Sequence, residues 1–316
     1  MNIALIGYGE VGRILAEDLR RQGQTVLAHD LKLFQPQAQG LHAHAEGIGV
    51  ALVHNHGSAV EGADLVLSAV TASQAVPVAQ ACAPHLRLGA FFLDFNSASP
   101  GAKIEAARWV NATGGRYVEG AVMSSIPPYR IQVPLLLGGP DAAALLPLLT
   151  GLGFVARVAS EKLGVASATK MCRSVIIKGL EAMIIEAFTT ARHYGVEDAV
   201  IASLQETYPG IDWEQQGAYF FQRVIEHGRR RSEEVQQVAQ TVFEAGLQPW
   251  SASSTAQRQA WVADLADGGV FGLRGEAGFA RIADWRIESD RLLAHRTHAE
   301  MVEDRIDPSD LFKERV

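Results

Sequence analysis

The feature that most constrains the fold of this chain lies at its start, where three glycines separate a short apolar run from an amphipathic segment. Gly7, Gly9 and Gly12 follow Ile3–Ile6 with the spacing G-x-G-x-x-G. Between a strand and a helix, such glycines permit a tight turn, a close backbone approach to a pyrophosphate, and close helix–strand packing, in that order. The N–H groups at the start of the helix then face the phosphates. We therefore predict that a dinucleotide binds the loop residues Gly7, Tyr8, Gly9, Glu10, Val11 and Gly12.

An acidic residue follows this loop at the distance expected for ribose recognition. The segment Thr25–Ala28 indicates a second strand, and Asp30 lies 18 positions after Gly12. A carboxylate at this place accepts hydrogen bonds from a ribose 2′-hydroxyl and repels a 2′-phosphate. The sequence therefore favours NAD over NADP as the cofactor, a preference that the nearby Lys32 weakens.

Apolar runs and amphipathic segments continue to alternate through the first half of the chain. Five further runs, at 63–70, 90–95, 116–123, 133–139 and 153–159, indicate buried strands. The predicted fold class is α/β with a mostly parallel sheet. Because ligands of such sheets gather outside the carboxyl ends of the strands, we expect the nicotinamide half of the cofactor to contact Val70, Thr71, Ser73, Asn96 and Ser97.

The segment 96–100 also has a purely structural interpretation. Ser99 followed by Pro100 is typical of a helix N-cap with proline at the first helical position. This segment therefore contacts the cofactor, caps the next helix, or does both.

Near residue 160 the pattern changes to helical periodicity. We place a nucleotide-binding domain over 1–160 and a helical domain over 161–316, with a long helix from Leu163 to Tyr194 that ends at Gly195. The other faces of this helix are apolar, so we expect it to be embedded on most sides. Its polar stripe is either a solvated face or the wall of a cleft, and the short hydroxyl side chains favour the cleft. The stripe comprises Ser167, Lys170, Ser174, Lys178 and Glu181.

Four segments carry a family resemblance. "IGYGEVG", "LDFNSASP", "VEGAVMSS" and "GVASATKMCRS" occur in the order and spacing of the β-hydroxyacid dehydrogenases, the group of 3-hydroxyisobutyrate and 6-phosphogluconate dehydrogenases. The later stretch 227–265 resembles a branch of that group whose C-terminal domain has no described function. The chain is thus similar to this family over nearly its whole length.

The resemblance implies an N-terminal Rossmann domain, an all-α C-terminal domain, an active site between them and a homodimer. It maps the family lysine onto Lys170 and the substrate-anchoring loop onto Glu119–Ser125. Met123 replaces the serine of that loop, Ser124 and Ser125 replace its glycines, and Arg173 and Ser174 replace an asparagine pair. We expect the substrate to contact Ser124, Ser125, Arg173, Ser174 and Lys178, although Lys178 has the alternative role of an interdomain ion pair.

The expected activity is hydride transfer between a nicotinamide cofactor and a small polar 3-hydroxy acid or sugar acid. Lys170 would take the proton of the substrate hydroxyl, because a lysine in a closed cleft loses hydration and its neutral form is favoured. Two alternatives remain open. One is an imine reductase-like enzyme, a class that generally lacks this lysine. The other is a non-catalytic dinucleotide-binding sensor or scaffold, which would not need it.

Three consecutive arginines, Arg229, Arg230 and Arg231, lie on a predicted helix with Glu233 and Glu234. They form a salt-bridged surface helix, or else one of Arg230 and Arg231 reaches the substrate cleft, either in the same subunit or from a partner subunit. Three aromatic residues nearby are expected to pack the helical core, namely Trp213, Tyr219 and Phe220.

Other functions and sites are disfavoured. The net charge of −7 argues against binding to nucleic acid or acidic membranes, and no apolar run approaches the ~20 residues of a membrane-spanning helix. The pairs His42/His44 and His54/His56 supply at most two ligands each, so we expect solvated loop histidines and no metal site. Two distant cysteines and an N-terminus without a basic region favour a cytoplasmic protein. We expect 305–316 to be a loosely held terminus.

Overall fold

The computed structural model describes residues 1–35 and 38–295, so the expected loose terminus 305–316 lies outside the described residues. The chain forms two compact units. The nucleotide unit contains residues 1–175 and 236–250, and the helical unit contains residues 176–235 and the chain from 251 onward. The last strand ends at Ser160, but the division between the units falls later, within the long helix that follows.

The nucleotide unit is built on one eight-stranded sheet in the order β3-β2-β1-β4-β5-β6-β7-β8. Strands β6 and β7 pair antiparallel, and the other neighbours pair parallel, which confirms the predicted mostly parallel sheet. The two-residue strand β3 was not predicted because it is too short to give a periodic signal. The strands are β1 Asn2–Ile6, β2 Thr25–His29, β3 Ala51–Leu52, β4 Leu65–Ser68, β5 Phe91–Asp94, β6 Arg116–Val122, β7 Leu135–Gly138 and β8 Ala156–Ser160.

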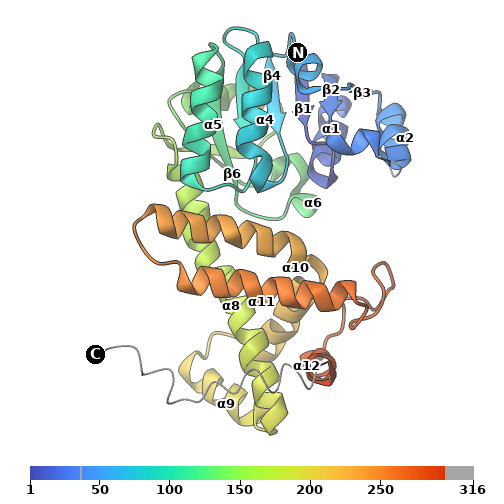
Figure 1. The fold of residues 1–316 in the computed structure, drawn as a ribbon, viewed down its shortest axis with the longest axis vertical. Coiled ribbons are helices and arrows are strands. Elements are labelled where there is room, and N and C mark those ends of the chain that lie inside the picture. The colour runs from blue at the N-terminus through green and yellow to red at the C-terminus, as the bar shows by residue number, and fades with distance from the viewer. Residues whose placement is uncertain (36–37, 296–316) are drawn as a thin grey trace. The chain divides into compact units, whose positions relative to one another are not determined.

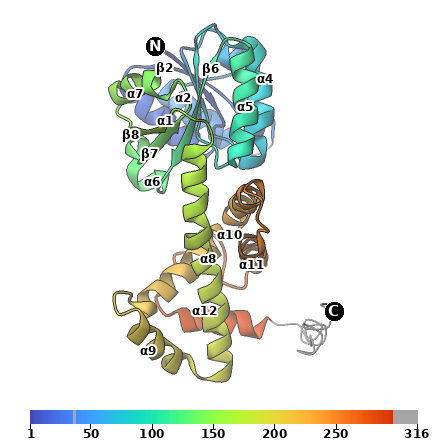
Figure 2. The same cartoon turned by 90° about the vertical axis from the view of Figure 1, so that its left-hand side faces the viewer.

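Helices cover both faces of this sheet, as Figure 2 shows, so its central strands are buried and mostly apolar, whereas the edge strands β3 and β8 are partly exposed. One face packs against α1 Glu10–Arg21, α2 Gln39–Ile48 and α7 Ala142–Gly151. The other packs against α3 His56–Val60, α4 Ala75–Cys82 and α5 Pro100–Ala112, of which α4 and α5 lie side by side (Figure 1). The short helix α6 Ile126–Tyr129 follows β6.

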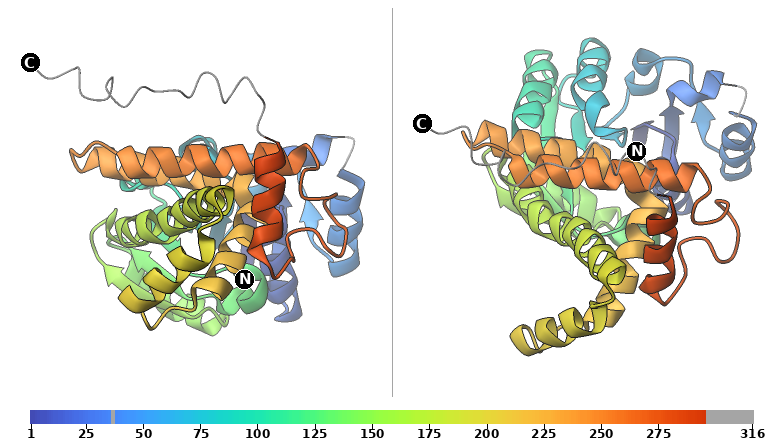
Figure 3. Two further views of the ribbon diagram at one scale, coloured as in Figure 1. Left: turned by 90° about the horizontal axis from the view of Figure 1, so that it is seen from below. Right: turned by 60° about the horizontal axis from the view of Figure 1, so that its bottom comes forward.

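The remaining helices are α8 Val165–Tyr194, α9 Glu197–Thr207, α10 Trp213–Glu244, α11 Trp250–Asp267 and α12 Trp285–Ala294. The core of the helical unit contains Phe188, Phe221 and Trp285, and Trp213 and Phe220 join it as predicted. Tyr219 does not, because it is 48% exposed. Within this unit α10 and α11 run side by side (Figure 3), and Gly228 allows their close approach because a Cβ there would lie 2.9 Å from the Gln259 carbonyl oxygen.

The long helix α8 is embedded as expected at Met171, Ile184 and Phe188 but departs from the expected burial at other positions. The polar residues Lys178 and Glu181 are only 7% and 2% exposed, whereas the apolar Ile176 and Met183 are 64% and 59% exposed. The physical reason is that Lys178 and Glu181 find charged partners on α10, while among the described residues nothing covers Ile176 and Met183. The prediction of a helix embedded on its apolar sides is therefore wrong for these residues.

A buried ion pair joins three helices of the helical unit. Arg231 on α10 donates from Nε to the Glu181 carboxylate on α8 at 2.9 Å, and Gln259 on α11 donates to the same carboxylate at 3.2 Å. Both charged side chains are almost fully buried. In contrast, Arg229 pairs with Asp264 and Asp267 at the surface.

We expect Arg231→Met to destabilise the protein by about 3–5 kcal/mol, because it leaves the buried Glu181 carboxylate without its cation. The matched variant Arg229→Met removes an exposed ion pair and should cost less than about 1 kcal/mol. Urea unfolding followed by circular dichroism measures both changes. Equal effects of the two variants would contradict this assignment of the buried pair.

Candidate active site

The predicted cofactor residues gather where the strand order reverses. Strand β1 lies between β2 and β4, so the connections after β1 and β4 leave the sheet in opposite directions. Such a reversal opens a crevice at the carboxyl ends of these strands, the usual ligand position in open α/β sheets. The glycine loop follows β1 directly, and Val70 and Thr71 follow β4.

The glycine loop has the shape of a phosphate cradle. Gly7 has a φ of +99°, and a Cβ there would lie 2.3 Å from the Ala69 carbonyl oxygen. A Cβ on Gly12 would lie 2.0 Å from the Gly7 carbonyl oxygen, so helix α1 packs against the turn too closely for any side chain. At Gly9, the N-cap of α1, a Cβ would meet nothing within 4 Å, and this residue has no side chain that could bond to the N–H groups of the first turn. The open space and the N–H groups of this turn fit a pyrophosphate.

The side chains of the other loop residues differ in exposure. The Tyr8 side chain is fully buried, its hydroxyl lies 3.0 Å from His44 Nδ1, and burial raises the pKa of Tyr8 to about 12. His44 Nε2 in turn lies 3.0 Å from Glu17. His42 and His44 thus belong to α2 and not to a solvated loop, which corrects the prediction. Glu10 is exposed and Val11 is half-buried.

Asp30 lies at the carboxyl end of β2 and is already bound to the protein on both oxygens. Oδ2 accepts the Tyr8 N–H at 2.7 Å, and Oδ1 accepts the Lys32 N–H at 2.8 Å, which caps the short 3₁₀ helix η1 Leu31–Phe34. The carboxylate is half-buried, and Lys32 is exposed. Each oxygen keeps a second lone pair, so a ribose hydroxyl can still donate to it.

Asn96 has a structural role that the sequence did not reveal. Its Oδ1 accepts the Val70 N–H at 2.7 Å and its Nδ2 donates to Ser68 Oγ at 3.0 Å, so its side chain ties the end of β5 to the end of β4. It is 4% exposed. Thr71 and Ser73 are exposed at the same edge. Ser99 is the N-cap of α5, as predicted, and accepts the Ala102 N–H.

Beneath this edge lies a buried charged cluster that the sequence reading missed. Lys103 Nζ lies 2.9 Å from Asp94 Oδ1, and the Tyr117 hydroxyl donates to Asp94 Oδ2 at 2.7 Å. All three side chains are at most 1% exposed. Burial and the adjacent Asp94 carboxylate hold the pKa of Tyr117 well above its usual value. An aspartate at the end of an apolar strand was the only signal in the sequence.

Lys170 reaches the carboxyl edge of β5. It lies in the second turn of α8, is half-buried, and donates from Nζ to Ser97 Oγ at 2.6 Å. Ser97 follows Asn96 in the loop after β5. Two predicted residues that are 73 positions apart in the chain are thus in direct contact.

The predicted substrate residues lie in different environments. Ser124 and Ser125 are exposed just after β6, and Arg173 is exposed on α8. Ser174 and Lys178 are buried, and Lys178 Nζ lies 2.5 Å from Glu234 on α10. Burial lowers the pKa of Lys178, while the Glu234 carboxylate opposes this shift. Lys178 therefore forms an ion pair, but with a residue of the same helical unit and not of another domain.

Two further groups of residues that the sequence singled out are described here. Glu119, the first residue of the predicted substrate-anchoring loop, is fully buried, and its carboxylate accepts hydrogen bonds from Ala166 and Ser167 at the start of α8. The arginines are salt-bridged, since Arg230 pairs with Glu234 at 3.0 Å, but Arg231 is buried and does not lie at the surface. Residue spacing alone did not indicate the burial of Glu119 or of Arg231.

Comparison with known proteins agrees with this architecture. Residues 2–143 match the NAD binding domain of 6-phosphogluconate dehydrogenase, and residues 191–262 match a domain of unknown function, DUF1932. A conserved hypothetical protein from Sinorhizobium meliloti is 35% identical, over 92% of this chain and 96% of its own, with a TM-score of 0.72. The chain belongs to the β-hydroxyacid dehydrogenase family.

Members and relatives of this family share the fold at lower identity. A 3-hydroxyisobutyrate dehydrogenase from Mycobacterium tuberculosis is 16% identical, over 92% of this chain and 98% of its own, with a TM-score of 0.65. An imine reductase from Myxococcus stipitatus, in complex with NADP⁺, is 17% identical, over 85% of this chain and 95% of its own, with a TM-score of 0.51. The chain therefore has the fold of hydroxyacid dehydrogenases and imine reductases and a nicotinamide-binding domain of this family.

Within the described residues, no group of three or more histidine, cysteine, aspartate or glutamate side chains could hold a metal ion. The described helices include none that is long and apolar enough to span a membrane.

His227, on α10, lies 3.6 Å from Glu226, and burial together with nearby arginines lowers its pKa to about 4.

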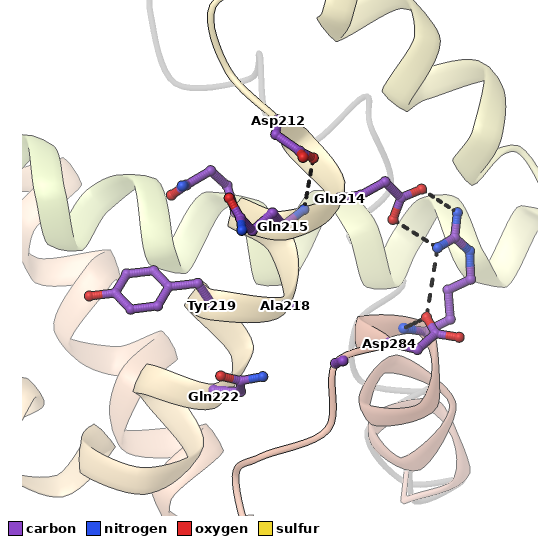
Figure 4. Close-up of a pocket in the computed structure, with 10 residues that line it drawn as sticks. Asp212, Glu214, Gln215, Ala218, Tyr219, Gln222 and Asp284 are labelled. Carbon is purple, nitrogen blue, oxygen red and sulfur yellow. Dashed lines mark hydrogen bonds and ion pairs between the residues drawn. The ribbon is translucent and has the colours of Figure 1, made fainter.

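A separate hollow of about 890 Å³ lies within the helical unit and contains none of the predicted site residues. Figure 4 shows it lined by Tyr219 and Gln222 of α10, with Asp212 at the start of that helix. Its charged residues already serve the fold, because Asp212 accepts the Gln215 N–H and Glu214 pairs with Arg286 at 2.8 Å. This hollow therefore offers polar side chains but no uncommitted charge.

We expect Gly12→Ala to weaken NADH binding more than about tenfold, because the added methyl group would displace the Gly7 carbonyl and distort the cradle. Gly40→Ala is the matched control, since a Cβ at this helical position meets nothing within 4 Å. Titration by nicotinamide fluorescence gives both affinities. Unchanged binding by Gly12→Ala would place the cofactor elsewhere.

Proposed function

We propose that this protein is an NAD-dependent dehydrogenase of a small polar 3-hydroxy acid or sugar acid, with Lys170 as its catalytic acid and base. The observation that carries this proposal is the contact between Lys170 Nζ and Ser97 Oγ. It brings an amine to the carboxyl edge of the sheet, the edge on which the glycine loop also lies. A sensor or scaffold has no need for an amine there.

The side chains near this edge supply acid–base chemistry. When bound, the nicotinamide accepts a hydride from the carbon that bears the substrate hydroxyl. In its neutral form Lys170 donates an N–H to Ser97 and keeps its lone pair for the hydroxyl proton. After the transfer its ammonium group stabilises negative charge on the substrate oxygen. In the reverse direction the same group returns the proton.

Arg173 supports an anionic substrate. It lies three residues after Lys170 on α8, so the two side chains project from neighbouring positions on the helix. Its planar guanidinium group suits a carboxylate, with which it forms two parallel hydrogen bonds. The exposed hydroxyl groups of Ser124 and Ser125 suit the hydroxyl groups of a sugar acid.

Imine reduction is the second candidate, because the chain shares the fold of an imine reductase. The two activities place different demands on Lys170. An alcohol loses its hydroxyl proton to a base, whereas an imine must receive a proton and no hydroxyl is present. A lysine held at the sheet edge by Ser97 supports the first reaction.

We expect Lys170→Met to lower kcat/KM about 10²–10⁴-fold, since it removes the general base, while NADH affinity remains unchanged. The protein is assayed with NAD and a panel of 3-hydroxy acids and sugar acids, and with NADH and cyclic imines. Lys162→Met, at an exposed position before α8, is the control. Turnover of imines alone, or full alcohol oxidation by Lys170→Met, would refute the proposal.

We expect Asp30→Asn to lower the ratio of kcat/KM for NAD to that for NADP at least about tenfold, because the neutral amide no longer repels a 2′-phosphate. Steady-state kinetics with each cofactor measures this ratio. An unchanged ratio would show that Asp30 serves only the loop and η1.

A further inference from the structure

A buried carboxylate on strand β6 contacts the first turn of α8, the helix that carries Lys170. Glu119 lies in β6 and is 0% exposed. Its Oε1 accepts the Ala166 N–H at 3.1 Å, and its Oε2 accepts the Ser167 hydroxyl at 2.7 Å and the Ser167 N–H at 3.4 Å. In the described part of the chain no cation pairs with Glu119, so its charge is met by the first turn of α8. A carboxylate is favoured there because the helix N-terminus carries partial positive charge.

The sheet leaves a specific space for this side chain. Glu119 pairs in antiparallel register with Gly138 of β7, and a Cβ on Gly138 would lie 2.2 Å from Glu119 Oε1. The carboxylate therefore occupies the space that a side chain at position 138 would take in this conformation. This arrangement fixes the direction in which Glu119 reaches α8.

Two adjacent strands contact the segment that carries Lys170, one at the helix backbone before it and one at its amine. In the parallel pair β5–β6, Asp94 is in register with Glu119. Strand β6 anchors the backbone of α8 at Ser167, one turn before Lys170, and the loop after β5 receives the Lys170 amine at Ser97. A shift of the helix by a fraction of a turn would move Nζ away from Ser97, since successive residues rise about 1.5 Å along the axis.

We propose that Glu119 is a positioning residue for Lys170, which it sets at the carboxyl edge of β5 by anchoring the first turn of α8 through Ala166 and Ser167. This inference deepens the proposed function and rests on it for the part that concerns turnover. Glu119 touches neither substrate nor cofactor in this scheme. It acts only through the helix.

The test compares three variants of the full-length protein. Glu119→Gln replaces one anchoring oxygen by an amide that cannot accept from the helix, and Ser167→Ala removes one donor. Glu105→Gln, an exposed position on α5, is the matched control. We measure the rate at which trinitrobenzenesulfonate labels Lys170, relative to Lys162 in the same digest, together with kcat, KM for NAD and the melting temperature.

The anchor predicts that Glu119→Gln raises the relative labelling of Lys170 at least threefold and lowers kcat about 10- to 100-fold, with KM for NAD unchanged within twofold. Ser167→Ala should give smaller changes in the same direction, and Glu105→Gln none. A kcat loss without a change in KM separates positioning from a general loss of structure.

If Glu119→Gln fails to fold, the test rests on Ser167→Ala. If Lys170 in the folded Ser167→Ala variant is labelled at the wild-type rate, the proposal is overturned. A wild-type labelling rate of Lys170 in a folded Glu119→Gln variant overturns it equally. The labelling needs no substrate. A change in labelling without any turnover by the wild-type protein would therefore refute the dehydrogenase activity and leave the role of Glu119 intact.

Discussion

Two buried carboxylates, in register on adjacent strands, set the geometry of the candidate site. Asp94 and Glu119 each bring a negative charge into the sheet, where an unsatisfied charge costs several kcal/mol. Lys103 and Tyr117 satisfy Asp94, which also accepts the Asn96 N–H and so shapes the loop that leads to Ser97. The start of α8 satisfies Glu119. The hydrogen bonds that satisfy these two charges therefore hold the start of the loop after β5 and the start of α8, the two segments that meet where Lys170 contacts Ser97.

The same physical rule organises the helical unit. Two pairs of charged residues between α8 and α10 lie largely out of solvent, Glu181 with Arg231 and Lys178 with Glu234, whereas Arg229 of α10 pairs with Asp264 of α11 at the surface. Buried pairs add little net stability but are costly to break, so they favour one helix arrangement over alternatives. Because α8 turns Lys178 and Glu181 toward the neighbouring helix, the apolar side chains of Ile176 and Met183 are left exposed to solvent.

Much of the nucleotide unit could be predicted because its signals are local. The glycine spacing, the apolar strands and the Ser99–Pro100 cap each lie within a few residues, and the structure has them where the sequence indicated. The burial of the α8 stripe could not be predicted, because periodicity shows which residues share a face but not which face another helix covers. The structural contacts of Asn96 and His44 could not be predicted for a similar reason, since their partners are 26 and 36 residues away.

In the proposed site, Asp30 would link cofactor choice to the architecture of the loop. Its two oxygens hold the Tyr8 amide and cap η1, so the atoms that would read the ribose also keep the glycine turn in shape. A change of this residue alone is expected to shift the preference between the two cofactors, but it also leaves at least one of the two amides without its acceptor, so a full exchange would need a new acceptor as well. Specificity at this position is therefore expected to drift slowly, in paired steps, and an engineer who wishes to change it should redesign residues 30–34 as a single segment.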